Sequence, residues 1–459
     1  MSEFRTEHDS MGTIDVPADR LWGAQTERSR RNFPIGVGKE TMPREIIHAF
    51  GLIKKAAALA NRELLPKKMT AEKCEAICAA ADEVIGGMLS EHFPLVVWQT
   101  GSGTQTNMNA NEVIANRGNQ LAGKRLLHPN DDINLSQSSN DTFPTALHLA
   151  AVTAVEDQLL PSLDALIVAL RKLEEDNADV VKTGRTHLQD AVPIRFSQEV
   201  SGWRASLEQD GRMLRAALPP LRELALGGTA VGTGLNAPAG FDRLAAEKLS
   251  LLTGKDFVPS QNKFRALTSL DGLVFAHGAM KALAADLMKL ANDVRWLASG
   301  PRCGLGEITI PANEPGSSIM PGKVNPTQCE QVTMVAVQVM ANDTAIGLAA
   351  SQGNFQLNVF LPVCADNFLR SARLLSESMA AFRANCVCGI QVNRIRMEEN
   401  LRRSLMSVTA LNPYIGYENA ARVAQLAFRE EITLREACIR LGYMEAERFD
   451  AVFCPEKMT

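Results

Sequence analysis

The longest apolar pattern in the chain lies in its second half. Apolar residues recur there at alternating spacings of three and four, at Leu273, Ala276, Met280, Leu283, Leu287, Leu290, Val294 and Leu297. This spacing places one apolar side chain on the same helix face at every turn. The pattern predicts a helix of about seven turns, whose apolar face needs other helices to cover it.

Four further stretches show helical periodicity. A leucine repeat lies within a helix expected over about residues 144–176, and other long helices are expected over about 193–218, 326–350 and 363–385. Five long helices with short connections indicate an antiparallel bundle. The long seam and the alanine-rich helices around it also favour association between copies of the chain.

The rest of the chain surrounds this bundle. Residues 1–137 combine loops with modest helices over about 43–64 and 71–89, and residues 395–459 form a smaller helical tail. We therefore expect an all-α protein of three domains, 1–137, 138–394 and 395–459, with a central long five-helix bundle. The glycine-rich stretch at 226–234 lacks the G-x-G-x-x-G spacing, so we expect only a loop at one end of the bundle.

Composition excludes several classes of function. The chain has 48 basic and 52 acidic residues, a net charge of -4 and no basic block, so no nucleic-acid or membrane partner is expected. The N-terminus lacks the apolar run of a secretory signal, and no segment approaches the ~20 apolar residues of a membrane span. The nine cysteines include no C-x-x-C pair. We therefore expect a cytoplasmic protein with reduced thiols and no metal.

The densest polar chemistry lies at residues 316–330, which read G-S-S-I-M-P-G-K-V-N-P-T-Q-C-E. Asn325 is a suitable N-cap and Pro326 suits the first helical position, so Lys323 is expected just outside a helix and Glu330 in its first turns. A cation, a carboxamide and a helix N-terminus together favour an anionic ligand. The spacing around Lys323 does not match a P-loop, so a carboxylate is favoured over a nucleotide phosphate.

Two other polar segments precede predicted helices. Asn140 comes just before the helix at 144–176, and Thr186 and His187 come just before the helix at 193–218. His187 is the best candidate for acid-base chemistry among the seven histidines, because polar residues surround it. Sequential helices of an antiparallel bundle start at opposite ends, so one chain is not expected to gather all three segments. A site shared between subunits would bring them together.

The G-S-S-I-M-P-G-K-V-N-P stretch from Gly316 resembles the signature motif of the fumarase/aspartase superfamily. The resemblance covers essentially the whole chain, including D-S-M-G-T-I-D-V-P-A-D-R-L-W-G-A-Q-T from Asp9 and H-P-N-D-D from His128. Within the superfamily the chain resembles the class II fumarate hydratases. Aspartate ammonia-lyases generally have Gln, Thr and Ala at the positions of His187, Ser139 and Gly322.

This resemblance implies a reaction and an assembly. The reaction is the reversible, cofactor-free hydration of fumarate to (S)-malate, a step of the tricarboxylic acid cycle. The assembly is a homotetramer whose active sites are built from several subunits. An aspartate ammonia-lyase is one alternative, and a superfamily scaffold without turnover is another.

The resemblance also implies residue roles. Ser317 corresponds to the family's catalytic base, His187 acts as an acid or through an activated water, and Glu330 orients and charges His187. Lys323 and Asn325 hold the substrate carboxylate. The other residues expected to bind substrate are Ser102, Thr104, Ser138, Ser139, Asn140, Thr186 and Ser318. His128, Asn130 and Asp131 lie in a segment that resembles the family's second, non-catalytic dicarboxylate site.

The physical chemistry agrees with these roles. Removing a proton beside a carboxylate makes an aci-carboxylate, which needs cations and N–H donors already in place. A serine hydroxyl is a weak base, so Lys323 or main-chain N–H groups of the loop would have to stabilise its alkoxide. The reverse assignment, with His187 as the base that takes the carbon proton, stays open.

Overall fold

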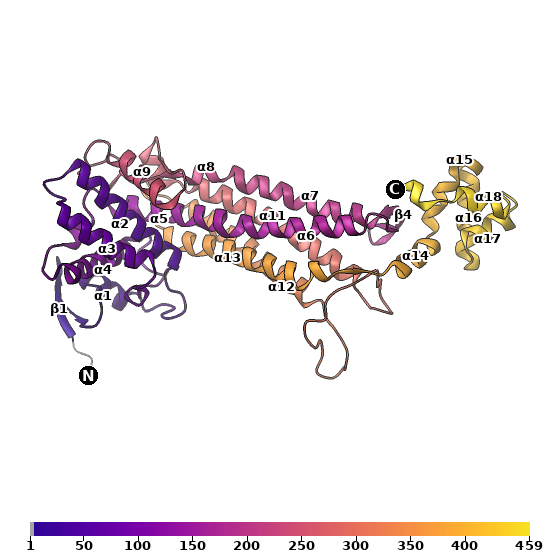
Figure 1. Ribbon diagram of the computed structural model, residues 1–459, viewed down its shortest axis with the longest axis horizontal. Coiled ribbons are helices and arrows are strands. Elements are labelled where there is room, and N and C mark those ends of the chain that lie inside the picture. Colours follow the sequence, from indigo (N-terminus) through magenta and orange to yellow (C-terminus); the bar gives the residue numbers. More distant parts are fainter. Residues whose placement is uncertain (1–3) are drawn as a thin grey trace. The chain divides into compact units, whose positions relative to one another are not determined.

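The computed structural model describes residues 4–459, and Figure 1 traces their helices and strands. These residues fold into two compact units. Unit 1 comprises the described part of Met1–Pro161 with Arg212–Ala282 and Val337–Ser376, and unit 2 comprises Ser162–Gly211, Leu283–Ala336 and Glu377–Thr459. Helices make up most of both units, so the all-α prediction is confirmed. The division into three domains stays a prediction.

Unit 1 opens with an antiparallel hairpin that was not predicted. β1 (Phe4–Asp9) pairs with β2 (Gly12–Pro17), and Val16 is the one fully buried residue of the pair, so the sequence shows no clear apolar alternation. The helical elements that follow are α1 (Ala24–Asn32), α2 (Arg44–Leu64), α3 (Ala71–Ile85), η1 (Ser90–His92), α4 (Thr104–Ala122) and η2 (Pro129–Ile133). The helices expected over 43–64 and 71–89 correspond to α2 and α3.

The first bundle helix begins earlier than predicted. α5 (Ser139–Ala154) passes through a π-helical turn, η3 (Val155–Leu159), into α6 (Leu160–Asp176). A capping box sets its start, because Ser138 Oγ accepts from the N–H of Asn140 at 3.3 Å and Asp141 Oδ1 accepts from the N–H of Ser138 at 2.9 Å. Pro144 therefore lies in the second helical turn, and Asn140 lies in the first.

The other long helices are α7 (Phe196–Ala216), α11 (Asp271–Leu297), α12 (Thr327–Ala350) and α13 (Leu361–Asn385). In unit 1, His277 of α11 contacts both α12 and α13, with Nδ1 3.0 Å from Asp343 Oδ1 and Nε2 2.8 Å from Ser371 Oγ. Ser376 of α13 donates to the Gln158 carbonyl of η3 at 3.0 Å. These contacts join helices of the predicted bundle.

The same helices pack together within unit 2. Arg204 of α7 pairs with Glu174 of α6 at 2.7 Å, and Trp203 of α7 donates to Asp293 of α11 at 2.8 Å. Ser378 of α13 donates to a side-chain oxygen of α12 at 2.9 Å. The five-helix bundle is therefore confirmed by contacts within each unit.

The shorter elements complete the two units. Unit 1 also contains α8 (Leu218–Leu221), β5 (Glu223–Leu224), α9 (Phe241–Thr253), β6 (Val258–Pro259) and α10 (Lys263–Thr268). Unit 2 also contains β3 (Val181–Thr186), β4 (Gln189–Arg195), β7 (Ile308–Thr309), η4 (Val387–Gly389), β8 (Gln391–Val392), α14 (Arg394–Arg403), η5 (Leu405–Leu411), α15 (Asn412–Ile415), α16 (Tyr417–Glu430), α17 (Leu434–Arg440), α18 (Ala446–Val452) and η6 (Pro455–Met458). The last of these helices enclose a small core that includes Leu411, Val423 and Phe449.

We expected no segment with the length and apolarity of a membrane span, and α12 departs from this expectation. By length and composition this helix is apolar enough to cross a membrane, with a mean hydropathy of 1.3 in its most apolar window. The core helix of a soluble protein passes the same test, so this property alone is weak evidence for a membrane span. Only 33% of that window is buried within the chain.

Candidate active site

Two helix N-termini lie together in unit 1. α4 begins directly after Gly103, whose φ is +73°, and a Cβ built on this glycine would lie 2.0 Å from Phe143 of α5. Only glycine therefore allows this approach. Asn107, in the first turn of α4, donates to Ser139 Oγ of α5 at 3.3 Å, and Ser102 Oγ lies 3.0 Å from Thr104 Oγ1. The structure thus brings the predicted residues at 102–104 close to those at 138–140.

The glycine-rich stretch at 226–234 contacts the N-terminus of α5. The sequence predicted only a loop for this stretch and did not predict the contact. Asp141 Oδ2 accepts from the N–H of Gly227 at 3.0 Å and from that of Thr229 at 2.9 Å. Asn140 donates to the Ala230 carbonyl at 2.8 Å. Burial raises the pKa of Asp141 to about 6, against the opposing effect of the N–H groups it accepts from. The stretch does form a loop, and it also holds Asn140 in place.

The segment predicted as a second dicarboxylate site forms one exposed turn of unit 1. His128 Nδ1 accepts from the N–H of Asp131 at 3.3 Å, and the same nitrogen lies 3.3 Å from Asp131 Oδ2. The N–H of His128 donates to Asp132 Oδ2 at 2.8 Å. Asn130 lies between them in η2. The three predicted residues are therefore neighbours, and their ligand stays a prediction.

His187 lies at the tip of a β-hairpin in unit 2. β3 and β4 pair around a two-residue connection, and both of its residues, His187 and Leu188, have positive φ, +57° and +61°. Such angles are uncommon for residues other than glycine, asparagine, aspartate and histidine, so Leu188 is the more strained of the two, and strained residues cluster at functional sites. The hairpin also corrects the predicted helix start, because the chain at Pro193 is still strand and α7 begins at Phe196.

A buried carboxylate anchors this hairpin. Glu307, which is fully buried, pairs with Arg185 of β3 at 2.6 Å and with the buried Lys182 at 3.1 Å. Asn400 of α14 donates to the same carboxylate at 3.0 Å. Burial alone would raise the pKa of Glu307, but the hydrogen bond from Arg185 and the charges of Lys182 and Arg185 hold the pKa below its usual range.

Replacing Glu307 with glutamine is expected to destabilise the protein by about 3–5 kcal/mol, because Arg185 would lose its carboxylate and the buried Lys182 would keep only Glu199, at 2.7 Å. Urea unfolding at one fixed protein concentration measures this change. The matched control is Glu398→Gln, which removes an exposed pair with Arg402 and should cost less than about 1 kcal/mol. Equal effects of the two variants would contradict the anchoring role of Glu307.

The loop from Gly316 to Lys323 is closed on itself. The N–H of Gly316 donates to the Lys323 carbonyl at 2.8 Å, and Asn325 Nδ2 donates to the Gly316 carbonyl at 2.7 Å. A Cβ on Gly316 would lie 2.7 Å from the Lys323 carbonyl oxygen, so the closure requires glycine there. The predicted cap is corrected by one residue: Pro326 accepts the first helical bond, from Glu330 at 3.1 Å, and the Asn325 side chain closes the loop instead.

The hydroxyl of Ser317 faces two main-chain donors. Its Oγ accepts from the N–H of Met320 at 3.1 Å and from the N–H of Ile319 at 3.3 Å. Donors aimed at an oxygen favour its negatively charged form. Lys323 is exposed, and among the residues that the structure describes no carboxylate pairs with it. The loop therefore offers an oxygen placed to carry negative charge and an uncompensated cation.

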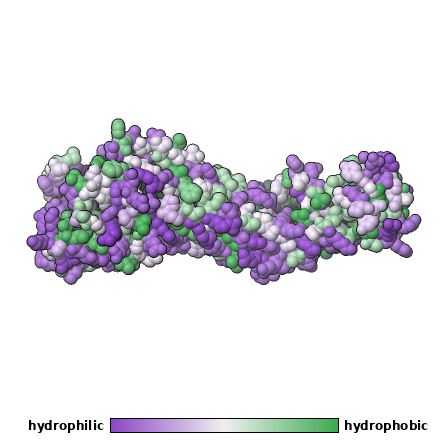
Figure 2. All heavy atoms as spheres, turned by 90° about the horizontal axis from the view of Figure 1, so that it is seen from above, coloured by the Kyte–Doolittle hydropathy of each residue, from purple (hydrophilic) through white to green (hydrophobic). Residues whose placement is uncertain are grey.

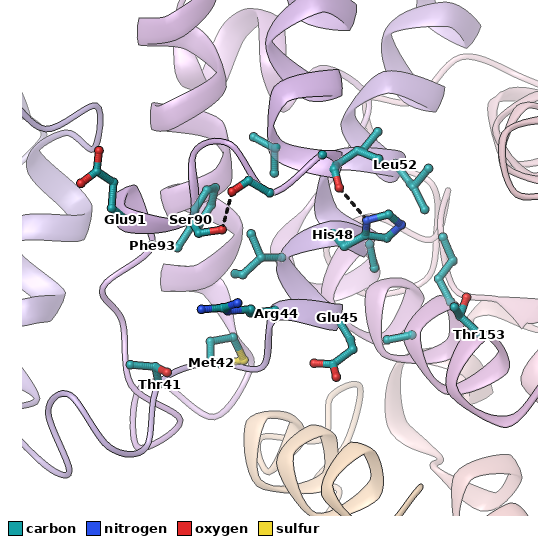
Figure 3. Close-up of a pocket in the computed structure, with 18 of the residues that line it drawn as sticks. Thr41, Met42, Arg44, Glu45, His48, Leu52, Ser90, Glu91, Phe93 and Thr153 are labelled. Atoms are coloured by element: carbon teal, nitrogen blue, oxygen red, sulfur yellow. Dashed lines mark hydrogen bonds between the residues drawn. The ribbon is translucent and has the colours of Figure 1, made fainter. Parts of the chain in front are cut away.

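Of two cavities in the structure, one is lined by predicted site residues and the other is not. One of about 550 Å³ in unit 2 is lined by Lys323 and Asn325 together with Arg295 and Trp296, and its lining has no carboxylate. Another, of about 940 Å³, opens in unit 1 between α2 and the segment after α3 (Figure 3). None of the predicted site residues lines the second cavity, whose charged side chains have both signs: Arg44, Glu45 and Glu91. The charge of the smaller cavity suits an anion better.

Known proteins match this chain along its whole length. A family model described as lyase matches residues 12–341, and one described as Fumarase C C-terminus matches residues 408–459. The chain is 59% identical to a fumarate hydratase class II of Bacillus cereus and 57% identical to one of Bacillus subtilis, each over 99% of both chains. The chain belongs to the class II fumarate hydratase family.

Solved structures of the family agree with the fold. A class II fumarase from Schistosoma mansoni matches with a TM-score of 0.96 at 44% identity, over 99% of both chains. A fumarate lyase:delta crystallin from Brucella melitensis, bound to cobalt, matches with a TM-score of 0.95 at 40% identity, also over 99% of both chains.

In this class II fumarate hydratase chain the predicted site residues fall into two groups, one in each unit. The group in unit 1 is Ser102, Thr104, Ser138, Ser139 and Asn140, and the group in unit 2 is Thr186, His187, Ser317, Ser318, Lys323, Asn325 and Glu330. Glu330 lies in the first turn of α12, as predicted. Within the described part of a single chain, His187 and Glu330 form no ion pair. Their pairing therefore stays a prediction.

Proposed function

We propose that this protein catalyses the reversible hydration of fumarate to (S)-malate. The observation that carries the proposal is the Ser317 loop, where two N–H groups face a hydroxyl oxygen and Lys323 has no carboxylate partner among the described residues. The named relatives supply the substrate, since they are fumarate hydratases at 57% and 59% identity. Purified protein should therefore raise ultraviolet absorbance when malate is added, because only fumarate has a conjugated double bond. No absorbance change with malate, but a rise with aspartate, would contradict the proposal.

In the direction from malate to fumarate, Ser317 takes the proton from the carbon beside one carboxylate. The electron pair of that C–H bond moves into the carboxylate and forms the aci-carboxylate dianion. The charge of Lys323 stabilises this species, and the N–H groups of Ile319 and Met320 help Ser317 to act as a base by favouring its alkoxide. Asn325 closes the loop and so holds Lys323 and Ser317 in one closed segment.

The second half of the reaction breaks the bond between carbon and oxygen. His187 donates a proton to the hydroxyl on the neighbouring carbon, which leaves as water while the double bond of fumarate forms. Glu330 orients His187 and stabilises its charged form in this scheme. The backbone at the hairpin tip supports this role, because His187 has a positive φ there and strained backbone clusters at functional sites.

The second carboxylate of the substrate needs its own donors. The N-termini of α4 and α5 provide them, because the hydroxyls of Thr104 and Ser139 lie in the first helical turns, where the helix dipole favours an anion. We assign this carboxylate to the group at 102–104 and 138–140. Thr186 and Ser318 complete the contacts in the other group.

We also propose that several subunits of a homotetramer share each active site. One face of α12 supports association, because Met334, Val337 and Leu348 lie along it and are 66%, 59% and 64% exposed. Apolar side chains at this exposure on one helix face favour burial against another protein surface. Figure 2 shows hydrophobic residues at the surface among hydrophilic ones. We therefore assign α12 to a subunit interface. We also propose that the enzyme is cytoplasmic.

Mixing two inactive variants tests the shared site. If His187 and Lys323 of one site come from different subunits, chains carrying His187→Asn and chains carrying Lys323→Met should form some intact sites when unfolded together and refolded. Random assembly predicts recovery of about a quarter of the wild-type activity. A chain carrying both substitutions, refolded with an equal amount of wild type, is the control: random assembly predicts about a quarter of the wild-type activity for a shared site and about half if one chain supplies both residues. No recovery from the mixed single variants would contradict the shared site.

A further inference from the structure

Lys54 is a fully buried lysine in the middle of α2, and it lies outside the residues assigned above. Its ammonium donates to Asn107 Oδ1 at 2.7 Å, to Gln137 Oε1 at 2.9 Å and to Asn134 Oδ1 at 3.3 Å. An ammonium has three hydrogen atoms to donate. Three amide oxygens therefore satisfy all of them, and none of these acceptors carries a negative charge.

The acceptors of Lys54 lead directly to the proposed substrate site. Asn107 uses its carbonyl oxygen for Lys54 and its amide group for Ser139 Oγ, at 3.3 Å. Thr142 of α5 donates to the same Asn107 oxygen at 3.1 Å. Gln137 directly precedes Ser138, the cap of α5. Lys54 therefore fixes the orientation of an amide that contacts a proposed substrate-binding hydroxyl.

The charge of Lys54 is only weakly compensated. Burial lowers its pKa to about 7, and the negative charge of Asp141 opposes this lowering. Three carboxylates on the helices packed against α2 are engaged elsewhere: Asp82 of α3 with Lys55, Glu83 of α3 with Arg117, and Glu112 of α4 with the N–H groups of Gly23, Gln25 and Thr26. Lys248 of α9 pairs with Glu63. Asp141 itself accepts from three N–H groups.

We propose that Lys54 is a positioning residue of the dicarboxylate site, which aligns Ser139 through Asn107 and adds a buried positive charge beneath the N-termini of α4 and α5. This inference rests on the proposed function. The charge acts on substrate through the low-dielectric interior and reinforces the helix N-termini, which also favour anions. Lys54 does not touch the reacting atoms.

A pH dependence follows from this arrangement. Substrate dianion and the Lys54 proton favour one another, so binding of either strengthens binding of the other. Affinity is therefore highest below the pKa of free Lys54, about 7. The affinity falls as the pH rises through that value. It levels off once the pH exceeds the pKa of Lys54 in the substrate complex, which the bound dianion raises. Replacing Lys54 with an uncharged residue should abolish this fall in affinity with pH, which we call the pH step.

The first test compares Lys54→Met with Lys55→Met, the same substitution at the next residue, whose ammonium pairs with Asp82 on the surface. For Lys54→Met we expect KM for malate, and Kd for the unreactive dianion succinate by calorimetry, to rise on the order of tenfold or more. We expect a smaller change in kcat and loss of the step in log(1/KM) between pH 6 and 8. For Lys55→Met we expect wild-type values.

Gln137→Glu provides a second test that keeps the lysine in place and covers the case in which Lys54→Met does not fold. The new carboxylate would neutralise the ammonium, so succinate should bind on the order of tenfold more weakly and the pH step should disappear. If this variant kept the wild-type affinity and pH profile, the proposal would be overturned. The same values in a folded Lys54→Met variant would also overturn it. A wild-type enzyme that does not convert malate would instead contradict the proposed function.

Discussion

Replacing Ser317 with alanine is expected to lower kcat for malate dehydration by about a thousandfold or more, because the substitution removes the oxygen that takes the carbon proton. KM should change much less. The hydrogen bonds that close the loop, from Gly316 to the Lys323 carbonyl and from Asn325 to the Gly316 carbonyl, do not use the Ser317 side chain, so the loop can stay closed around alanine. Steady-state kinetics and the exchange of the malate C3 proton with solvent measure the loss.

Two further variants make this result decisive. Ser351→Ala changes an exposed serine after the end of α12 and should leave kcat within twofold of wild type. His187→Asn should also lose turnover, but in our scheme it should retain some exchange of the C3 proton, since Ser317 is still present. If Ser317→Ala kept near-normal turnover and His187→Asn lost both turnover and exchange, Ser317 would be a binding residue and His187 the carbon base.

The second large effect is expected at Lys323. Lys323→Met should lower kcat/KM by about a hundredfold to a thousandfold, the range for losing one donor to a transition-state anion. Most of the loss should appear in kcat, because the negative charge beside the ammonium increases as the aci-carboxylate forms.

The matched control for Lys323→Met is Lys289→Met in the same unit. Lys289 forms an exposed pair with Asp293, one turn away on α11, so its replacement should leave kcat/KM within twofold of wild type. Retention of wild-type kcat in Lys323→Met would remove Lys323 from the mechanism and leave the anion to the helix N-termini.

The long helices could be predicted from sequence because their signal is repeated many times. Eight apolar positions between Leu273 and Leu297 specify α11, and no single residue decides the outcome. Helix starts depend on one or two residues, and there the predictions were displaced. The helix expected at Pro144 begins at Ser139, since the capping box of Ser138 outweighs the proline signal.

Other parts of the candidate site carry no local signal. His187 and Leu188 form a tight hairpin turn although Leu188 is not a residue that favours positive φ, so the surrounding strands and the Glu307 anchor determine the turn. Lys54 occupies a helix of apolar residues, where a lysine in sequence gives no indication that it is buried. Its acceptors come from α4 and from residues 134–137, about 50 to 80 positions further along the chain.

The polar loop was the easiest part of the site to recognise, because its chemistry is contiguous. Ser317, Lys323 and Asn325 lie within nine residues, and the structure confirms that they belong to one closed loop. The roles assigned to them come from family resemblance and chemical argument. The variants described above test those roles directly.

Helix α12 carries Glu330 in its first turn and exposes an apolar face along the turns that follow. If both features serve as we propose, a substitution on that apolar face has two linked effects. It weakens the association of subunits, and it also lowers the activity of the site that Glu330 belongs to. In a cell that makes normal and altered chains together, one defective copy would also be built into several catalytic centres at once. The fraction of activity lost would then exceed the fraction of chains that carry the substitution.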